Sequence, residues 1–258
     1  MPTDWNQQSA LCLDALETPA FAETLAAGIR SVVSYDFTVI FGYVGAKRPL
    51  ALYDDFTPER RKLHVDEYLE GPYLIDPFFL ASTGDTPPGV WRLRDIAPDR
   101  FYQGEYFRSY YAQTGLAEEV GFLLDANKEL SIVVSLMRTE RKFSKTEFRV
   151  LTDIQPAVDA LCRRHWSNNV HREQAEASGT LPQKVTGAFK AVGDGALTPR
   201  ESEIVELTLR GHSSEAIGRL LDISPGTVRI HRRNVYSKLR INSQGELFSI
   251  FLKTLGAT

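Results

Sequence analysis

The chain has few cysteines and no long apolar run. Its 258 residues include two cysteines, Cys12 and Cys162, which fall in expected helices far apart in the sequence. Such a pair is typical of buried thiols in a reducing compartment and not of a disulfide framework. No apolar stretch approaches the roughly 18 residues of a membrane span, and the N-terminus lacks a signal-peptide pattern. We therefore expect a cytoplasmic protein with no membrane partner.

The sequence also lacks the usual patterns of catalytic and metal-binding residues. Its five histidines are scattered without metal-ligand spacing, and neither a nucleophile elbow nor a glycine-rich phosphate loop is present. A phosphoacceptor receiver domain would show repeated βα units with acidic residues at the strand ends, which the N-terminal half does not. These absences argue against an enzyme, a metal site, a cofactor and a response regulator. An enzymatic activity kept by the N-terminal domain stays an alternative, which a mass change in an incubated ligand would reveal.

Charge is divided unevenly along the chain. The net charge is −3, and 43% hydrophobic with 24% charged residues is ordinary for a globular protein of one large or two ordinary domains. From Ala196 onward there are nine basic and six acidic residues, a net of +3, whereas the remainder has a net of −6. The positive charge gathers at the C-terminal end, as expected for a region that contacts nucleic acid.

Four helix-start signals follow one another between Leu197 and Leu255. Each is a capping hydroxyl, followed by proline, by a glutamate within the first turn, or by both: Thr198-Pro199 with Glu201, Ser213 with Glu215, Ser224-Pro225, and Ser243 with Glu246. The helices expected at about 213–221 and 225–240 are separated only by Leu221 to Ser224. Two helices joined by so tight a turn predict a helix-turn-helix, whose second helix enters the DNA major groove.

The second helix of this pair, at about 225–240, has two distinct faces. At about 100° per residue, Val228, Val235 and Leu239 form an apolar stripe that is expected to point inward. The opposite side offers guanidinium groups for guanine edges and phosphates, an amide, and one aliphatic chain for a thymine methyl. Its members are Ile230, Arg233, Asn234 and Ser237, flanked by Thr227, Arg229 and Lys238. The plainer interpretation is a solvated basic face, but the tight turn and the regular caps favour DNA contact.

These motifs resemble the LuxR-type DNA-binding domain. The resemblance rests on Leu197-Thr198-Pro199-Arg200-Glu201, Gly211, Glu215-Ala216-Ile217-Gly218, Ile223 through His231, Asn234 and Lys238-Leu239. It implies that Arg229, Ile230 and Arg233 read bases, and that Thr227, His231 and Lys238 hold the DNA backbone. It also implies a homodimer through the last helix, whose apolar stripe is Leu247, Phe248, Phe251 and Leu255. Ile250 and Leu252 add apolar surface beside that stripe.

The N-terminal part alternates between helical and strand patterns. Helical pieces are expected over residues 5–33 with a break at Thr18-Pro19, over 58–69 as an exposed helix, over 101–112, and from the capping box Ser144/Glu147 to about His171. Strands are expected at 37–44, 50–53, 117–124 and 130–137, with Val90-Trp91 after a Gly/Pro-rich turn. This order predicts a sheet with helices on both sides, an α/β/α plan shared by autoinducer-binding, PAS and GAF sensor domains, with a pocket between the sheet and the helices of the middle section.

Asp76-Pro77 and Trp91 resemble the aspartate-proline and tryptophan of LuxR-type autoinducer-binding domains. In that family the aspartate accepts the signal's amide hydrogen and the tryptophan packs on its ring. The family's tryptophan and tyrosine that hold the lactone are Leu63 and Glu67 here, and an expected glycine is Glu119. These departures disfavour an acyl-homoserine lactone and favour at least equally another small molecule, such as one with an amine or amide. The candidate ligand-binding residues are Tyr53, Tyr73, Asp76, Trp91, Phe101 and Tyr106.

The predicted architecture is an α/β/α sensor domain at 1–173, a linker at 174–195 and a four-helix DNA-binding domain at 196–258. The predicted function is a ligand-responsive transcriptional regulator that binds double-stranded DNA as a homodimer. Plainer interpretations of the sensor residues stay open, because Asp76 before proline is also typical of a turn or cap and aromatic residues dominate cores. The alternative function is a regulator whose N-terminal domain is a protein-interaction module with no small-molecule ligand.

Overall fold

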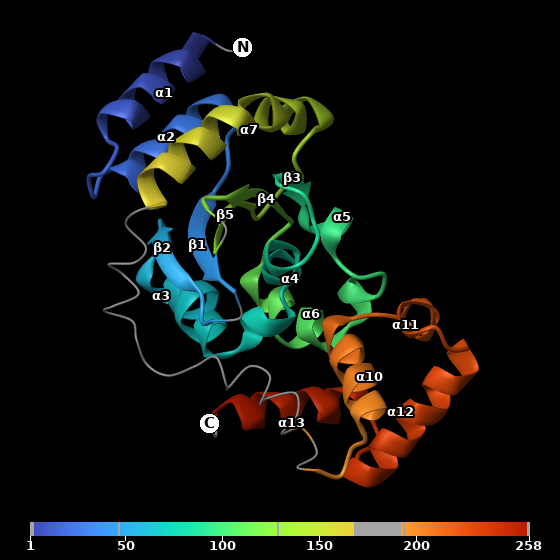
Figure 1. Ribbon diagram of the computed structural model, residues 1–258. Helices are drawn as coiled ribbons and strands as arrows, with labels where there is room; N and C mark the ends of the chain where they lie inside the picture. The colour runs from blue at the N-terminus through green and yellow to red at the C-terminus, as the bar shows by residue number, and fades with distance from the viewer. Residues whose placement is uncertain (1–2, 46, 128, 168–191, 193–194, 257–258) are drawn as a thin grey trace. The chain divides into compact units, whose positions relative to one another are not determined.

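The computed structural model describes residues 3–45, 47–127, 129–167, 192 and 195–256 (Figure 1). The chain divides into two compact units. The first comprises Met1–Val65, Phe78–Ile96 and Leu116–Thr180, and the second comprises Asp66–Pro77, Ala97–Gly115 and Leu181–Thr258, each in its described part. Most of the predicted linker at 174–195 lies outside the described residues, so the boundaries at 173 and 196 stay a prediction.

A five-stranded antiparallel sheet forms the centre of the first unit. Its strands are β1 (Phe37–Val44), β2 (Leu50–Asp54), β3 (Gly89–Arg92), β4 (Glu118–Asp125) and β5 (Leu130–Arg138), in the order β2-β1-β5-β4-β3. The four predicted strands are confirmed to within one residue at each end, and Val90-Trp91 lies in β3. β-Branched and aromatic side chains fill these strands because they pack well on a pleated, buried surface.

Three helices cover one face of this sheet. They are α1 (Thr3–Asp14), α2 (Phe21–Val32) and α7 (Lys145–Trp166), which lie side by side in Figure 1. Alternate residues of the strands, such as Ile40, Phe122 and Val134, enter the core beneath them. The predicted break at Thr18-Pro19 and the Ser144/Glu147 capping box are both present. α7 is described from Lys145 to Trp166, and its predicted end at about His171 lies outside the described residues.

The other face of the sheet carries α4 (Pro77–Thr83). A Cβ atom at Gly121 of β4 would lie 2.4 Å from the Phe78 ring, so glycine is needed for this close approach. The ring of Phe79 meets that of Tyr43 with centroids 5.5 Å apart. Helices therefore lie on both sides of the sheet, as the order of elements predicted.

Residues 58–70 correct the prediction of a single exposed helix. The segment consists of α3 (Pro58–Arg61), a π-helix (Lys62–Glu67) and a 3₁₀ turn (Tyr68–Glu70). His64 is only 7% exposed and stacks on Phe56 with centroids 4.4 Å apart. Val65 and Tyr68 of the same segment are buried as well, at 0% and 6% exposed, which the polar composition of the segment did not indicate. The short α5 (Leu93–Ile96) follows β3.

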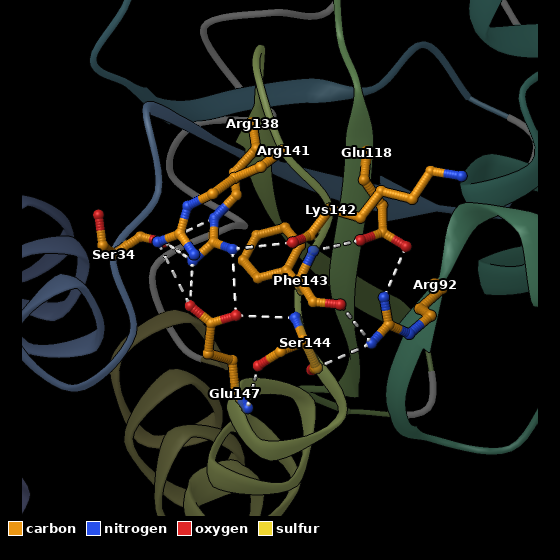
Figure 2. Close-up of polar contacts among 9 residues, drawn as sticks. All are labelled: Ser34, Arg92, Glu118, Arg138, Arg141, Lys142, Phe143, Ser144 and Glu147. Carbon is orange, nitrogen blue, oxygen red and sulfur yellow. Dashed lines mark hydrogen bonds and ion pairs between the residues drawn. The ribbon is translucent and has the colours of Figure 1, made fainter.

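A polar clasp fastens the start of α7 to the sheet (Figure 2). The Arg138 guanidinium donates to both carboxylate oxygens of Glu147, at 2.7 and 3.2 Å, and Glu147 also accepts the backbone N–H of Ser144 at 2.7 Å. Beside it, Arg92 donates to Glu118 at 2.6 Å and to the Phe143 carbonyl at 3.0 Å. Each buried charge here has a partner, which is the condition for burial to be tolerated.

The second unit contains the four C-terminal helices together with two earlier segments. The helices are α10 (Pro199–Arg210), α11 (Ser214–Leu221), α12 (Pro225–Leu239) and α13 (Gln244–Gly256). The segment 66–77 contributes a 3₁₀ turn (Pro72–Ile75). The segment 97–115 contributes a 3₁₀ turn (Phe101–Gln103), α6 (Glu105–Ser109) and a further 3₁₀ turn (Tyr111–Thr114).

The continuous helix predicted at 101–112 is therefore wrong. It is interrupted at Gly104, which is extended, and at Tyr110, which has φ −125° and ψ −68°. No side-chain cap starts any of its pieces. Its aromatic rings pack around Phe101, so tertiary contacts and not local helix propensity set the backbone.

Candidate functional site

The backbone conformation at three residues forms the tight turn between α11 and α12. Asp222 ends α11 in the left-handed region at φ 52°, which aspartate tolerates better than most residues. The Ile223 N–H then donates to the Gly218 carbonyl at 2.9 Å. A Cβ at Gly218 would lie 2.7 Å from the Ile223 carbonyl oxygen, so only glycine allows this approach. The predicted helix-turn-helix is thus present, with α11 and α12 packed against each other.

Caps fix the start of each C-terminal helix. The side-chain oxygens of Thr198, Ser213 and Ser224 accept backbone N–H groups of their helices, as predicted. Ser243 Oγ accepts the N–H of Glu246 at 3.2 Å, but the Glu246 carboxylate accepts from Asn242 N–H at 3.3 Å and not from the Ser243 N–H. The predicted capping box of α13 is therefore only half present, because Glu246 bonds the N–H of the residue before the cap.

α12 presents the predicted polar face to solvent. Arg229, Arg233 and Asn234 are exposed, and the Ile230 side chain is 50% exposed. Thr227 and His231 are half-buried at the edge of this face, and the Thr227 hydroxyl is 2.8 Å from Ser224 Oγ. On the inner side Val228 and Val235 are buried, whereas Leu239 is half-buried. An exposed aliphatic chain among cations is unfavourable in water and suits contact with a base edge.

Two ion pairs connect α12 to its neighbours, and they differ in burial. Arg229 pairs with Glu215 at 2.6 Å, with side chains 62% and 48% exposed. Lys238 pairs with Glu201 at 2.6 Å, and Glu201 is only 5% exposed. Although burial alone raises the pKa of Glu201, the bonds from Lys238 and Thr198 outweigh it and hold that pKa below its usual value. Lys238 therefore has a structural partner, which the sequence did not reveal.

α13 packs against α10 and α6. Within this unit Leu247, Phe248 and Phe251 are 1%, 3% and 0% exposed, and the side chain of Leu255 lies outside the described residues. The three described side chains of the predicted dimerisation stripe are thus covered inside one chain in this conformation. Ile250 is half-buried and Leu252 is 38% exposed.

Several predicted ligand-binding residues gather in the second unit. Asp76 is 8% exposed, and the Tyr106 hydroxyl lies 3.4 Å from its carboxylate. The Phe101 ring contacts that of Tyr106 at 5.8 Å between centroids, and Tyr73 contacts Tyr68 at 6.2 Å. Tyr73, Phe101 and Tyr106 are all buried. The structure thus brings a buried carboxylate and a phenol together, next to an aromatic cluster.

The two predicted ligand-binding residues of the first unit lie on different sides of the sheet. Tyr53 is paired with Ile40 and packs against the core beneath α1, α2 and α7. Trp91 is paired with Gly121, whose Cβ direction faces Phe78 on the α4 side. Residues directly opposite in an antiparallel pair share a face, so Tyr53 and Trp91 cannot share a pocket. The Trp91 indole donates to the Pro87 carbonyl at 3.0 Å.

The α4 side of the sheet also carries a residue that the sequence analysis did not propose. Glu119 of β4 is two residues from Gly121, so its side chain shares that face, and it is 6% exposed. Its place directly before the apolar run Val120–Leu124 of the strand is the signal that could have found it. Among the described residues, no group of histidine, cysteine and acidic side chains has the arrangement of a metal site. Across the same described part, no helix is both long and apolar enough to cross a membrane.

Known proteins with similar sequences are transcriptional regulators by their names. Residues 195–251 match the family described as "Bacterial regulatory proteins, luxR family". The chain is 37% identical over 186 residues to an Aeromonas salmonicida protein named as an HTH-type transcriptional regulator in the exeN 3′ region. That alignment covers 70% of this chain and 94% of the relative. The chain is also 43% identical over 183 residues to the monoamine regulon transcriptional regulator of Klebsiella aerogenes, covering 71% of this chain and 70% of that one.

A solved structure resembles the N-terminal part. The LBD domain of VqsR from Pseudomonas aeruginosa superimposes with a TM-score of 0.55 and 26% identity. The match covers 63% of this chain and 96% of that structure. The N-terminal α/β unit and the C-terminal helices thus both have counterparts among proteins of one kind.

Proposed function

Because the chain belongs to the LuxR family of bacterial regulatory proteins, which are transcriptional regulators and not enzymes, we propose that it binds promoter DNA in response to a small-molecule signal. Two findings support this proposal. The C-terminal part matches the LuxR-family DNA-binding domain, and the N-terminal part resembles a LuxR-type sensor domain. The observation that carries the DNA-binding part is the exposed face of α12, held by a capped helix-turn-helix. The proposal also implies that the protein acts in the cytoplasm, where bacterial promoter DNA lies.

In the proposed complex, α12 enters the major groove. Arg229, Ile230 and Arg233 read base edges, while Thr227 and His231 contact phosphates at the margin of the groove. Asn234 lies on the same exposed face and extends the contact to a base or phosphate. Lys238 reaches phosphate only by sharing or leaving its pair with Glu201. The Arg229–Glu215 pair is exposed and weak, so Arg229 can exchange Glu215 for a guanine.

The test of this assignment is a base-resolved binding measurement on the full chain. Arg233→Ala should weaken binding to its preferred operator by about 1–3 kcal/mol and relax preference at one base position. Arg219→Ala, which removes an exposed arginine of α11, serves as the control. Equal weakening of Arg233→Ala on every DNA sequence would show that Arg233 contacts phosphate and does not read bases.

The proposed signal is a small molecule that carries an amine or amide. Asp76 is buried beside Tyr106, and this carboxylate is suited to accept an N–H of a ligand. A relative is named as the regulator of a monoamine regulon, and a monoamine carries such an N–H group. Tyr73 and Phe101, which are buried in the second unit, are the aromatic residues proposed to contact the signal. For Tyr53 and Trp91 of the first unit, contact with a ligand stays a prediction from the sequence.

The signal is proposed to act through the segment 97–115. Tyr106 belongs to α6, and α6 packs against α13, whose Leu247, Phe248 and Phe251 form the family's dimerisation stripe. A ligand that changes the position of Tyr106 would change what covers that stripe. A ligand shifts such an equilibrium only if it binds the two arrangements with different affinity. Homodimers would then meet two half-sites one helical turn apart, about 34–36 Å.

Thermal-shift screening of the full chain against amines, amides and acyl-lactones tests signal binding. A specific ligand raises the unfolding temperature, and the rise grows with the logarithm of its concentration relative to its Kd. The Asp76→Asn variant should lose the shift, whereas Asp85→Asn, in the exposed turn before β3, should keep it. Absence of any specific shift would favour the alternative, a protein-interaction module that needs no small molecule.

A further inference from the structure

A polar cavity in the second unit has no role in the function proposed above. It has a volume of about 160 Å³, more than ten times the roughly 10–15 Å³ that admits one water molecule. Its walls come from the segment 97–115, from the α10–α11 turn, from α12 and from the start of α13. The lining residues are Arg100, Gln103, Gly104, Arg108, Gly211, His212, Arg232 and Gln244.

Three guanidinium groups face this small space. No ion pair to a carboxylate is present for Arg100, Arg108 or Arg232 among the residues that the structure describes. Arg108 donates to the Gln103 carbonyl and Arg232 donates to the Tyr236 hydroxyl at 3.3 Å, so each has donors left for another acceptor. Three like charges around one cavity repel each other, and an anion between them removes that repulsion.

The acidic residues nearby are occupied by other partners. Asp99 accepts the Ser213 N–H at 3.0 Å, Glu105 accepts the Ser109 hydroxyl at 3.0 Å, and Glu215 pairs with Arg229. His212 is half-buried, and burial lowers its pKa more than Asp99 raises it, so it adds a neutral hydrogen-bonding group. Gln244 uses its amide N–H on the Thr208 carbonyl at 3.1 Å. No acidic residue is among those that line the cavity, although Glu215 outside it attracts Arg100 as well as Arg229.

The backbone around the cavity is built for close packing. The Arg100 N–H donates to the Gly211 carbonyl at 3.0 Å, and a Cβ at Gly211 would lie 3.0 Å from the Phe101 Cα. Gly211 also has φ +97°, a conformation that other residues rarely adopt. Arg100 is thereby held at a fixed distance from the α10–α11 turn that carries His212.

DNA phosphate is an unsuitable occupant because Arg232 points away from the reading face. At about 100° per residue, Arg232 lies about 200° from Ile230 around α12 and only about 40° from the buried Val228. It is half-buried, whereas Arg229 and Arg233 are exposed. When α12 lies in the major groove, this side of the helix is turned from the DNA.

We infer that this cavity binds a small phosphate-type anion, either free phosphate or a phosphate monoester. The anion would accept hydrogen bonds from Arg100 and Arg108 on the segment 97–115 and from Arg232 on α12. Guanidinium groups bind phosphate oxygens in this way, with two parallel bonds where the geometry allows. The bound anion joins that segment to the DNA-binding helices and stabilises the arrangement in which α6 packs on α13. This inference does not depend on the proposed amine or amide signal.

Isothermal titration of the full chain with inorganic phosphate tests the site, with sodium chloride used to keep ionic strength constant. Phosphate should bind and raise the unfolding temperature above that in chloride. Arg232→Gln should weaken binding by about tenfold or more, as expected for a lost charge-assisted bond. Arg108→Gln, which alters an exposed side chain, should weaken it also, whereas Arg219→Gln on the surface of α11 should not. Methyl phosphate in a parallel titration shows whether the cavity prefers free phosphate or a phosphate monoester.

Three results would overturn the inference. They are an absence of phosphate binding beyond chloride, equal affinity in the wild-type protein and in both cavity variants, and an equal loss in Arg219→Gln. DNA titrations test whether Arg232 binds phosphates of the DNA backbone instead of a small anion. Arg232→Gln should leave the salt dependence of DNA binding unchanged, and a reduction of its slope by about 1 would instead assign Arg232 to the DNA backbone.

Discussion

The two compact units use the same local motif, but they complete it differently. In the first unit Ser144 and Glu147 form a capping box at the start of α7, and in the second Thr198 and Glu201 form one at the start of α10. Each glutamate also binds a cation from a distant element. For Glu147 the cation is Arg138 of β5, with a side chain 3% exposed, and for Glu201 it is Lys238 of α12, with a side chain 38% exposed.

The difference lies in how the cation is held. Arg138 donates to both oxygens of Glu147 and also to the Lys142 and Ser34 carbonyls, so it is a planar group fixed on several sides (Figure 2). Lys238 makes a single bond to one carboxylate oxygen and keeps part of its surface in water. A capping glutamate thus makes a rigid clasp at the sheet of the first unit and a more adjustable contact with α12 in the second.

The largest effect should follow from removing the rigid cation. Arg138→Met leaves Glu147 without its bidentate partner and leaves two backbone carbonyls without a donor, which should lower the free energy of unfolding by about 3–5 kcal/mol. Urea unfolding of the full chain measures it. Arg141→Met, at an exposed arginine 3.6 Å from the same carboxylate, is the matched control and should cost less than about 1 kcal/mol. Similar losses in both variants would show that charge near Glu147 matters and that the geometry of Arg138 does not.

Acid should weaken the first clasp in a defined pH range. The hydrogen bonds from Arg138 lower the pKa of Glu147 from 4.5 to about 2. A carboxylate with a lowered folded-state pKa stabilises the protein above its unfolded pKa and loses that contribution as pH falls, here from about pH 5 down to pH 2. The loss should reach about 3 kcal/mol at most. Stability measured against pH should fall less steeply below pH 4.5 in Glu147→Gln than in the wild type. Other carboxylates with a lowered pKa, such as Glu201, keep part of the acid dependence in both proteins.

His64 also makes stability depend on pH, over a higher range than Glu147 does, so the two contributions must be distinguished. Burial lowers the pKa of His64 from 6.5 to about 4, with a smaller contribution from Arg60. Because the unfolded chain binds a proton there and the folded chain does not, stability also falls between pH 6.5 and pH 4. This part should persist in Glu147→Gln. A pH profile that is unchanged by Glu147→Gln would contradict the lowered pKa of the clasp.

The adjustable contact should give a smaller effect on stability. Lys238→Met leaves the buried Glu201 with its Thr198 bonds only, and we expect a loss of about 1–2 kcal/mol. The control is Lys253→Met, an exposed lysine of α13, with a change within about 0.5 kcal/mol. If Lys238 served only to contact DNA, stability would not change and the salt slope of DNA binding would fall by about 1.

The comparison also explains what the sequence could predict. Both capping boxes were predicted, because a hydroxyl and a glutamate three residues on are a local pattern. Neither Arg138 nor Lys238 was predicted as their partner, because strand pairing and helix packing bring residues together that are far apart in the chain. The same reason explains the segment 101–112, where the helical spacing of aromatic residues was visible but their packing around Phe101 was not.

The candidate sites follow the same division. The exposed face of α12 could be predicted from helical periodicity, since one helix holds all its residues. The candidate ligand-binding residues come from several elements of the fold. Tyr53 lies opposite Ile40, next to a β-bulge, and the strand pattern alone does not reveal that register. The arginine cavity was missed because its three cations are spread over 132 positions of the chain.

The smallest effect should come from the exposed pair on the reading helix. Glu215→Gln removes the carboxylate that competes with DNA for Arg229, and both side chains are largely exposed, so folding stability should change less than in Lys238→Met. DNA binding should become tighter by up to about fivefold, since an exposed pair is weak and a negative charge near phosphate is lost. Fluorescence anisotropy with labelled operator DNA at fixed salt measures this change. Weaker binding, with altered base preference at the position read by Arg229, would show instead that Glu215 orients the guanidinium. In that case the exposed pair, like the Arg138 clasp, would act as a fixed support.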